Sequence, residues 1–308
     1  MRYENDEGIQ EYIKKDRANW RKLAGHDRHW RKVKELEQMN TDNKVTANIH
    51  ETAVVAPGAK IAAGVEIGPY SVIGENVEID EGTKIGPHVV IHGWTQIGKD
   101  CRIFQGASIG EEPQDLKFRG EKSYTIIGDR TTIREGATIH RATGEGEETR
   151  VGNDCLLMAL THVAHNCVVG NHVIMSNLAS LAGHVVVEDR AVIGGMAGVH
   201  QFVKIGRNAM VGGMSKLTQD VVPYTIVDGQ PAKVVGLNAV GISRAGIKLE
   251  ARRNIKKAYK LLYRSGLSLQ QAIAVIEQEV DSCEEVEHFL RFLRNTERGI
   301  CRERRERD

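Results

Sequence analysis

The sequence predicts an all-β solenoid of six-residue repeats, followed by an α-helical region. Three observations support this fold class. Steps of six residues from Ile49 to Leu217 give 29 positions, of which 26 are aliphatic. Glycine occurs 32 times in the 308 residues, whereas aromatic residues make up only 5%. Beyond Leu217 the six-residue period ends, and apolar residues recur at helical spacing instead.

The six-residue period is interpreted as a coil with three flat faces. It matches neither the 3.6-residue turn of an α-helix nor the two-residue alternation of a single amphipathic strand. In a three-faced coil the aliphatic residue points inward, and glycine, asparagine or a small residue closes each corner. Three faces of six residues make a coil of 18, so residues i and i+18 stack about 4.8 Å apart. The narrow interior explains why aromatic rings are scarce.

Three positions interrupt the aliphatic pattern: Asp115, Glu121 and Glu145. They fall within segments 111–125 and 141–149. Both segments are predicted to be loops that leave the solenoid. Insertions in repeat proteins tend to lie at functional faces, so these loops are candidates for part of a binding or catalytic site.

The region after residue 217 is expected to begin with a connector, because Pro223 and Pro231 interrupt regular structure. Three helices are predicted next: one from about residue 243, one capped by Ser268, and one over 283–294. Their inward faces are expected to carry Ala251, Ile255, Ala258, Leu262, Ala272, Ile273, Val275, Ile276, Val286, Phe289 and Leu290.

Changes in composition divide the chain into three predicted domains. Residues 1–44 form a charged, helical extension, residues 45–229 the solenoid, and residues 230–308 the helical domain. The charged tail over 301–308 is expected to fray.

The overall composition excludes several classes of protein. Lys and Arg number 42 and Asp and Glu 41, so no global positive charge favours nucleic acid. No apolar run approaches about 18 residues, so no membrane span is predicted. The polar N-terminus does not resemble a secretory signal, and five cysteines without a C-x-x-C pair favour reduced thiols. A cytoplasmic location is therefore expected.

Histidines are concentrated in one stretch of the solenoid. Several of the twelve lie there, among them His162, His165, His184 and His200. The 18-residue coil stacks His165, Gly183 and Gln201 in one column, and it places His184 over Asn166 in the adjacent column. An imidazole beside a rigid backbone N–H can act as a general base next to an oxyanion donor.

The histidine cluster leaves more than one interpretation open. It lacks a G-x-S-x-G serine or an activated cysteine, which favours direct transfer to a bound hydroxyl or amine over a covalent intermediate. The histidines are alternatively polar corner residues without a catalytic role. A zinc site shared between neighbouring subunits is a further alternative, although no carboxylate or cysteine completes an obvious ligand set.

A strongly basic segment lies between Arg244 and Arg264. It holds eight basic residues and one acidic residue, a local charge of +7 against +1 for the whole chain. Residues four apart form one helical stripe: Lys248, Arg252, Lys256, Lys260 and Arg264. The stripe predicts a docking surface for an acidic partner or phosphates, and a solvated helix face is the alternative.

Specific motifs within and after the repeats carry a resemblance to a known family. They are 114–117 (QDLK), 139–141 (IHR), 161–167 (THVAHNC), 182–184 (AGH), 199–202 (VHQF) and 259–266 (YKLLYRSG). With the hexapeptides they resemble the bacterial UDP-N-acetylglucosamine O-acyltransferases, from about residue 45 to the last helix.

The resemblance implies a left-handed parallel β-helix that forms a homotrimer, with active sites in clefts between subunits. It implies transfer of an (R)-3-hydroxyacyl chain from acyl carrier protein to the 3-hydroxyl of UDP-N-acetylglucosamine, the first step of lipid A biosynthesis. No cofactor or metal is implied, since the acyl donor is carried on the phosphopantetheine of acyl carrier protein. The basic stripe would then contact that acidic partner.

The resemblance also assigns roles to individual residues. His165 matches the general base, and Gly183 matches the oxyanion-stabilising amide. The matched substrate contacts are Gln114, Asp115, Lys117, His162, His184, His200, Gln201, Asn238 and Arg244. Gly213 occupies the position that limits acyl-chain length, where glycine leaves room for a longer chain.

Three residues depart from the family pattern. Asn166 replaces the aspartate that follows the catalytic histidine, Val240 an acidic nucleotide contact, and Ala245 an arginine. Two other functions remain as alternatives: a zinc-dependent lyase of the carbonic anhydrase type on the same solenoid, and a non-catalytic trimeric scaffold.

Overall fold

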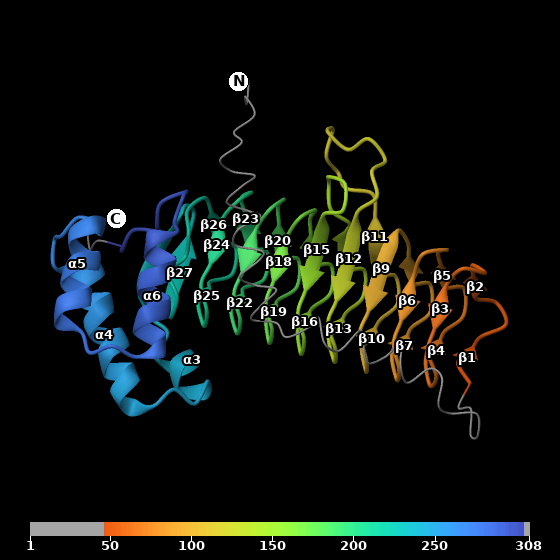
Figure 1. Ribbon diagram of the computed structural model, residues 1–308, viewed down its shortest axis with the longest axis horizontal. Coiled ribbons are helices and arrows are strands. Elements are labelled where there is room, and N and C mark those ends of the chain that lie inside the picture. Colours follow the sequence, from red (N-terminus) through yellow and green to blue (C-terminus); the bar gives the residue numbers. More distant parts are fainter. Residues whose placement is uncertain (1–45, 305–308) are drawn as a thin grey trace. The chain divides into compact units, whose positions relative to one another are not determined.

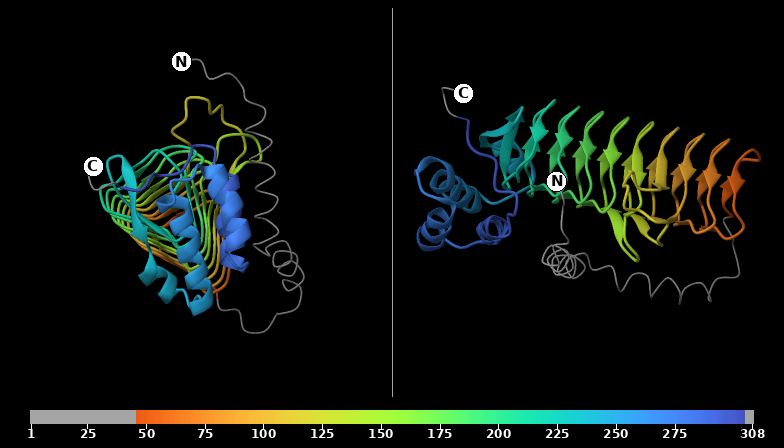
Figure 2. Two further views of the ribbon diagram at one scale, coloured as in Figure 1. Left: turned by 90° about the vertical axis from the view of Figure 1, so that its left-hand side faces the viewer. Right: turned by 90° about the horizontal axis from the view of Figure 1, so that it is seen from above.

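Three parallel sheets form the three walls of a prism, and four helices follow them in the chain (Figures 1 and 2). This computed structural model describes residues 46–304. The helical extension predicted over 1–44 lies outside the described residues. Parallel β-helix followed by helices is the fold class that the sequence predicts, and this prediction is confirmed.

The walls consist of short strands, most of them two residues long. Within residues 46–304, sheet A has 11 strands, sheet B nine and sheet C eight. Sheet A contains β1 (Asn48–Ile49), β4 (Glu66–Ile67), β7 (Lys84–Ile85), β10 (Arg102–Ile103), β13 (Thr132–Ile133), β16 (Leu156–Leu157), β19 (Ile174–Met175), β22 (Val192–Ile193), β25 (Met210–Val211), β27 (Thr225–Gly229) and β28 (Ala232–Leu237).

The other two walls have the same design. Sheet B contains β2 (Val54–Val55), β5 (Val72–Ile73), β8 (Val90–Ile91), β11 (Ser108–Glu111), β14 (Thr138–His140), β17 (His162–Val163), β20 (Ser180–Leu181), β23 (Gly198–Val199) and β26 (Lys216–Leu217). Sheet C contains β3 (Lys60–Ile61), β6 (Glu78–Ile79), β9 (Trp94–Ile97), β12 (Tyr124–Ile127), β15 (Glu148–Val151), β18 (Val168–Val169), β21 (Val186–Val187) and β24 (Lys204–Ile205).

The 18-residue stacking of the coils is confirmed by the strand register. Val163 in β17 pairs with Leu181 in β20, and Leu181 pairs with Val199 in β23. All three side chains point inward and are at most 4% exposed. The coils therefore share one continuous aliphatic core.

The corners differ from the sequence expectation in one respect. Many residues with positive φ there are not glycine or asparagine, for example Leu160 at 60°, His184 at 61° and Phe202 at 65°. We name the corners after the sheets that they join: A–B, B–C and C–A. Leu160 lies at the A–B corner, where its side chain is 57% exposed, so the corner backbone accepts large side chains that extend away from the core.

Both predicted loops leave the prism where β11 leads to β12 and β14 leads to β15. We call residues 112–123 the first excursion and residues 141–147 the second excursion. Figures 1 and 2 show them side by side, projecting from one edge of the prism. A backbone hydrogen bond from Gly146 N–H to Lys122 O joins them, and one from Tyr124 N–H in β12 to Glu147 O holds the second excursion beside the end of the first, each at 2.8 Å.

The connector is more regular than the sequence suggested. Strand β27 continues sheet A beside β25, and β28 folds back antiparallel to it. The turn between them contains a cis Gln230–Pro231 peptide bond. The boundary predicted between residues 229 and 230 falls within this turn.

Four helices occupy residues 239–294, the part of the chain after the last strand. They are α3 (Ala239–Arg244), α4 (Leu249–Arg264), α5 (Leu269–Glu279) and α6 (Glu284–Arg294). The last three match the predicted helices, and Ser268 caps α5 in a capping box with Gln271. The short helix α3, which Asn238 caps, was not expected.

The prediction of a frayed tail is wrong for its first residues. Ile300 forms a parallel bridge with Asp220, and Glu303 forms another with Val234. Cys301 between them is 1% exposed. The chain thus returns to the end of the prism after α6.

Candidate active site

His165 and Gly183 are neighbours at the corner between sheets B and C. His184 N–H donates to His165 O at 3.0 Å, and Phe202 N–H donates to Gly183 O at 3.2 Å, so the corner residues stack from coil to coil as predicted. A Cβ atom on Gly183 would lie 2.5 Å from His165 Nε2. Only glycine leaves space for the imidazole there.

The backbone N–H of Gly183 is available for a ligand. Gly183 is buried, and among the described residues no acceptor receives its N–H. A buried N–H without an acceptor carries a desolvation cost, which an incoming oxygen anion relieves. The Gly183 N–H therefore has no acceptor among the described residues, and the His165 ring lies beside this glycine.

The two nitrogens of His165 have different surroundings. Nδ1 lies 2.9 Å from Asn166 Oδ1, and Nε2 lies 4.0 Å from Asp115 Oδ2. The ring meets His184 edge to face at 5.3 Å, and His184 stacks on Phe202 at 4.7 Å. Nδ1 is thus held by the protein, whereas Nε2 is directed toward the first excursion.

Two further histidines lie beside His165 on sheet B. His162 Nδ1 is 2.7 Å from Thr138 Oγ1, and its ring meets His140 edge to face at 5.0 Å. Burial lowers the pKa of His162 to about 4, with smaller contributions from His140 and His165. Burial also lowers the pKa of His140, although Glu111 opposes this shift. Both rings are therefore neutral at neutral pH and can hydrogen-bond without adding charge.

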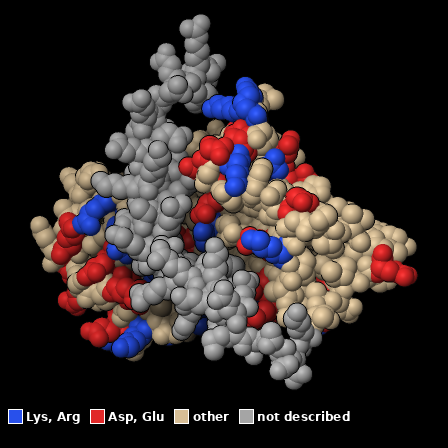
Figure 3. Space-filling view, turned by 45° about the vertical axis from the view of Figure 1, so that its right-hand side comes forward, with Lys and Arg blue, Asp and Glu red and all other residues tan. Residues whose placement is uncertain are grey.

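The first excursion brings Asp115 to the histidines. Its tip is a tight turn in which Lys117 N–H donates to Asp115 Oδ1 and Phe118 N–H donates to Asp115 O, each at 3.0 Å. Asp115 is half-buried beside His165, whereas Gln114, Leu116 and Lys117 are exposed. Figure 3 shows charged side chains of both signs crowded at the top of the molecule, over the protruding excursions.

Arg141, the last residue of the 139–141 motif and one for which no role was predicted, supports the base of the first excursion. Its buried guanidinium donates to Gly110 O and to Glu112 Oε1, each at 3.2 Å, and lies 5.1 Å from the Phe118 ring. Thr143 and Glu121 were also not predicted as site residues. Glu121 could have been found because it interrupts the six-residue pattern, whereas no feature of that pattern distinguishes Arg141 or Thr143.

His200 and Gln201 occupy the same B–C corner as His165, further along the prism. Both are exposed, and His200 Nδ1 lies 3.2 Å from Gln201 O. The column of His165, Gly183 and Gln201 predicted from the coil length is therefore present. These residues extend the surface that begins at His165 toward the helical region.

Asn238 and Arg244 lie away from His165 within one chain. Asn238 caps α3: its Oδ1 accepts from Gly241 N–H, and its Nδ2 donates to Asn208 O, each at 2.9 Å. Asn208 belongs to the C–A corner, between β24 and β25. Arg244 is exposed at the end of α3. The single chain thus does not bring these two residues to the B–C corner.

Gly213 lies at the A–B corner beside Gly195. A Cβ atom on Gly213 would meet only Gly195 backbone atoms, at 3.4 Å and beyond. The same corner carries a row of exposed apolar side chains at 18-residue spacing. They are Leu160 (57% exposed), Leu178 (46%), Met196 (56%) and Met214 (58%).

The cysteines are not poised as nucleophiles. Burial raises the pKa of Cys101 to about 11 and that of Cys155, Cys167 and Cys301 to about 12. These thiols stay protonated at neutral pH, and the thiolate is the reactive form. Within residues 46–304, no group of three or more His, Cys, Asp or Glu side chains is arranged to hold a metal ion.

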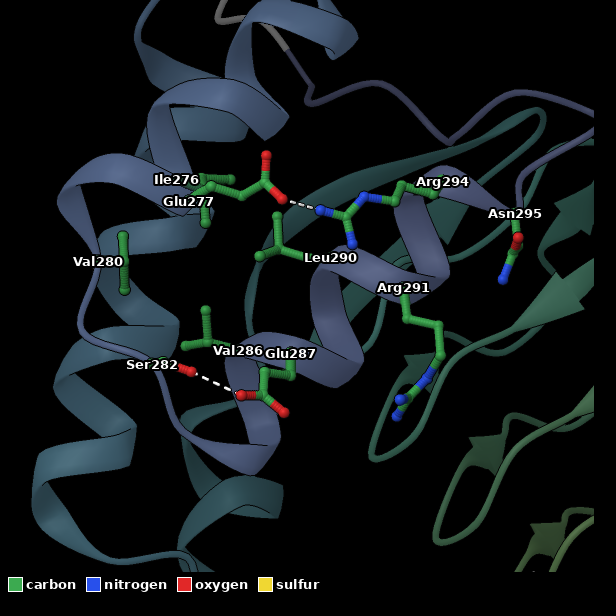
Figure 4. A pocket seen from close by; sticks show the side chains of 10 residues that line it. All are labelled: Ile276, Glu277, Val280, Ser282, Val286, Glu287, Leu290, Arg291, Arg294 and Asn295. Carbon is green, nitrogen blue, oxygen red and sulfur yellow. Dashed lines mark hydrogen bonds and ion pairs between the residues drawn. The ribbon is translucent and has the colours of Figure 1, made fainter. Parts of the chain in front are cut away.

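A pocket between α5 and α6 is separate from this site (Figure 4). Apolar side chains of both helices line it, and Ser282 and Glu287 hydrogen-bond at one side while Glu277 and Arg294 pair at the other. None of the site residues predicted from the sequence lines the pocket. In the described part of the chain, no helix is both long and apolar enough to cross a bilayer.

The B–C corner therefore combines three chemical capacities. The Nε2 atom of His165 can accept a proton, the Gly183 N–H can donate to a developing oxyanion, and the Asp115 carboxylate can orient a polar ligand. This set suits attack by a ligand hydroxyl on a carbonyl carbon.

Comparison with known proteins identifies relatives over most of the chain. A family model described as "Udp N-acetylglucosamine O-acyltransferase; Domain 2" matches residues 220–301, and one described as "Bacterial transferase hexapeptide (six repeats)" matches residues 46–81. The acyl-[acyl-carrier-protein]–UDP-N-acetylglucosamine O-acyltransferase of Trichlorobacter lovleyi is 54% identical over 259 residues, which are 83% of this chain and 99% of the relative. The protein of that name from Thermodesulfovibrio yellowstonii is 49% identical over 255 residues, 82% of this chain and 99% of the relative.

A solved structure agrees with these sequence matches. The crystal structure described as UDP-N-acetylglucosamine O-acyltransferase (LpxA) from Moraxella catarrhalis superposes with a TM-score of 0.80 at 41% identity. The superposition covers 82% of this chain and 99% of that one.

Proposed function

Because this chain belongs to the family of UDP-N-acetylglucosamine O-acyltransferases, we propose that it transfers an (R)-3-hydroxyacyl chain from acyl carrier protein to the 3-hydroxyl of UDP-N-acetylglucosamine. This reaction would be the first step of lipid A biosynthesis. The observation that carries the proposal within the chain is the contact between His165 and Gly183 at the B–C corner.

His165 is the proposed general base. Its Nε2 takes the proton from the sugar 3-hydroxyl while that oxygen attacks the carbonyl carbon of the acyl thioester. A neutral imidazole is suited to this transfer near neutral pH. Because Nδ1 lies within hydrogen-bond distance of Asn166, Nε2 is the nitrogen that is left to face a substrate.

Gly183 is the proposed oxyanion donor. Attack converts the carbonyl oxygen into an anion, and the Gly183 N–H donates to it. Collapse of this tetrahedral intermediate breaks the bond from carbon to sulfur and releases the phosphopantetheine thiolate. The imidazolium of His165 returns its proton to that sulfur, so the enzyme ends in its starting state.

The surrounding polar residues are proposed substrate contacts. Asp115 faces the catalytic histidine, and the exposed Gln114 and Lys117 flank it on the same turn. The remaining proposed contacts on the prism are His162, His184, His200 and Gln201. Neutral His162 offers hydrogen bonding without a charge that would perturb the base.

We propose that the active enzyme is a homotrimer with sites between subunits. Asn238 and Arg244, the proposed nucleotide contacts, lie away from the corner that carries His165. A neighbouring copy can supply them where one chain does not. The exposed apolar row at the A–B corner also supports assembly, because soluble monomers rarely expose such continuous apolar surface.

The basic stripe on α4 is the proposed surface for acyl carrier protein. Lys248, Lys256 and Lys260 are exposed, whereas Arg264 pairs with Glu303 at 3.1 Å. Three exposed ammonium groups on one helix face suit an acidic partner. Gly213, next to Gly195, is the proposed determinant of acyl-chain length.

The replacement of His165 by alanine tests the mechanism. Turnover of UDP-N-acetylglucosamine and 3-hydroxyacyl carrier protein is followed by release of the free thiol. We expect kcat to fall by roughly 10²- to 10⁴-fold, the usual contribution of a general base. The matched control is His172→Ala, an exposed corner histidine of the same coil, which should retain turnover within about twofold. Turnover near that of the wild type in His165→Ala would show that His165 is not the general base, whereas no turnover in either protein would support a scaffold instead.

A further inference from the structure

Asn166 is held in a single orientation by the backbone of Thr143. Thr143 N–H donates to Asn166 Oδ1 at 2.9 Å, and Asn166 Nδ2 donates to Thr143 O at 3.1 Å. A backbone N–H can only donate and a carbonyl can only accept, so these two bonds define which carboxamide atom is oxygen. The side chain is only 4% exposed, so water does not compete.

This orientation determines where His165 carries its proton. Asn166 Oδ1 has no hydrogen to give, and it lies 2.9 Å from His165 Nδ1. Nδ1 must therefore be the protonated nitrogen of the neutral ring. The lone pair is then on Nε2, the atom that faces Asp115 and the space beside Gly183.

The peptide unit between Thr143 and Gly144 is held from its other edge by Glu121. Gly144 N–H donates to Glu121 Oε1 at 2.8 Å. In a planar trans peptide the C=O and the N–H point in opposite directions. Asn166 therefore binds the carbonyl edge of this unit, and Glu121 binds the amide edge.

Glu121 is well suited to this contact. Its Oε2 accepts from Arg119 N–H at 2.7 Å, so one carboxylate joins the first excursion to the second. Hydrogen bonds from backbone N–H groups, that of Arg119 first, lower the pKa of Glu121, so it is charged at neutral pH. A charged acceptor makes the stronger hydrogen bond.

We propose that Glu121 is a positioning residue for catalysis, which acts through the Thr143–Gly144 peptide and Asn166 to keep the proton of neutral His165 on Nδ1. The inference rests on the proposed role of His165 as the base. The same hydrogen-bond network links the first excursion, which carries Asp115, to the position of the proton on His165.

Substitution of Glu121 by glutamine is the direct test. The amide retains one acceptor oxygen and replaces the other with an NH₂ group, so either Gly144 or Arg119 loses its acceptor. Nitrogen-15 NMR of labelled histidine side chains reports which ring nitrogen carries the proton, and the signals of His165 are identified by their loss in His165→Asn. We expect the Nε2–H form of His165 to increase in Glu121→Gln and kcat to fall by about tenfold.

The matched control is Glu145→Gln. Glu145 also joins the two excursions, because its Oε2 accepts from Lys122 N–H at 3.0 Å. Among the described residues it accepts only this one hydrogen bond, which the carbonyl oxygen of glutamine can keep. We expect the proton to stay on Nδ1 and kcat to stay within about twofold of the wild type.

Three outcomes would overturn the proposal. They are a wild-type His165 protonated on Nε2, a tautomer unchanged in both Glu121→Gln and Glu121→Ala, and an equal change in Glu145→Gln. The NMR measurement requires no substrate. A failure of the proposed role of His165 as the base, seen as full activity in His165→Ala, is therefore distinguishable from a failure of this linkage.

Discussion

The three residues that interrupt the hexapeptide pattern all lie in the two excursions, and two of them reach the candidate site. Asp115 Oδ2 lies 4.0 Å from His165 Nε2 and Glu121 holds Gly144, whereas Glu145 only joins the excursions to each other through Lys122. Their position in the sequence marked the two excursions as functional. Their individual contacts were not predictable, because loop conformation does not follow the 18-residue coil.

At the residue scale, the space around Gly183 makes a specific prediction. In Gly183→Ala the new Cβ would lie 2.5 Å from the Cε1 and Nε2 atoms of His165, so the imidazole must move away from the proposed oxyanion donor. We expect kcat to fall by about 100-fold or more, since reacting groups tolerate little misplacement. Steady-state kinetics of the folded variant measures the loss.

The control for this substitution is Gly236→Ala, a glycine in β28 whose added Cβ would meet no atom within 4 Å. It should keep both the melting temperature and the activity of the wild type. If Gly183→Ala were as active as this control, the imidazole would not lie where the structure places it.

The lowered pKa of His162 predicts a dependence of stability on pH. The unfolded histidine titrates near 6.5 and the folded one near 4, so the unfolded chain binds the proton first as the pH falls. The free energy of unfolding should therefore decrease between about pH 6.5 and pH 4, by on the order of 1 kcal/mol after allowance for solvent screening. Calorimetry over this range gives the free energy of unfolding of the wild type and of His162→Asn, and the difference between the two proteins should narrow toward pH 4. A difference that does not change with pH would contradict the lowered pKa of His162.

At the scale of elements, helix α6 is anchored to the prism by a buried polar contact. His288 Nε2 lies 3.0 Å from Glu188 Oε2, and their side chains are 8% and 12% exposed. Glu188 Oε2 also accepts from Arg207 N–H at 2.7 Å, and the Arg207 guanidinium pairs with Glu284 at 3.0 Å. These contacts connect the first turns of α6 to the C–A corner of the prism.

Removal of the His288 side chain tests this anchor. In His288→Ala the buried Glu188 carboxylate loses its side-chain partner, so we expect a loss of about 3 kcal/mol in the free energy of unfolding. Lys84→Ala, which removes the exposed pair with Glu66, should cost less than about 1 kcal/mol. Urea denaturation gives the free energy of unfolding of the two variants and the wild type. Equal losses in His288→Ala and Lys84→Ala would show that the contact between His288 and Glu188 contributes little.

The sequence predicted the elements of the prism because each coil repeats one local rule. It also placed His165, Gly183 and Gln201 in one column, since no insertion interrupts the chain between them. The 18-residue spacing does not hold across the excursions, because their extra residues lengthen the coil. Thr138 pairs with His162, 24 residues away, and the ring of the nearby His140 therefore contacts that of His162. Helix α3 escaped prediction because it has six residues and depends on a cap from Asn238 rather than on an apolar stripe.

At the scale of the whole molecule, the proposed homotrimer with sites between subunits predicts complementation. His165→Ala lacks the proposed base and Arg244→Ala lacks a proposed nucleotide contact, so each variant alone should be strongly impaired. In mixed trimers, some sites combine His165 from one copy with Arg244 from another. Co-expression of the two variants should therefore recover a measurable fraction of wild-type turnover. No recovery in mixed trimers, verified by two different affinity tags, would place both residues in a site within one chain.

The central claim is the transfer of a hydroxyacyl chain to the sugar nucleotide. The most direct measurement is mass spectrometry of UDP-N-acetylglucosamine incubated with the protein and a mixed pool of 3-hydroxyacyl carrier proteins. The account predicts a product heavier by one 3-hydroxy fatty acid less one water, esterified at the 3-hydroxyl, and dependent on His165. Folded protein that yields no such ester from any member of the pool would contradict it.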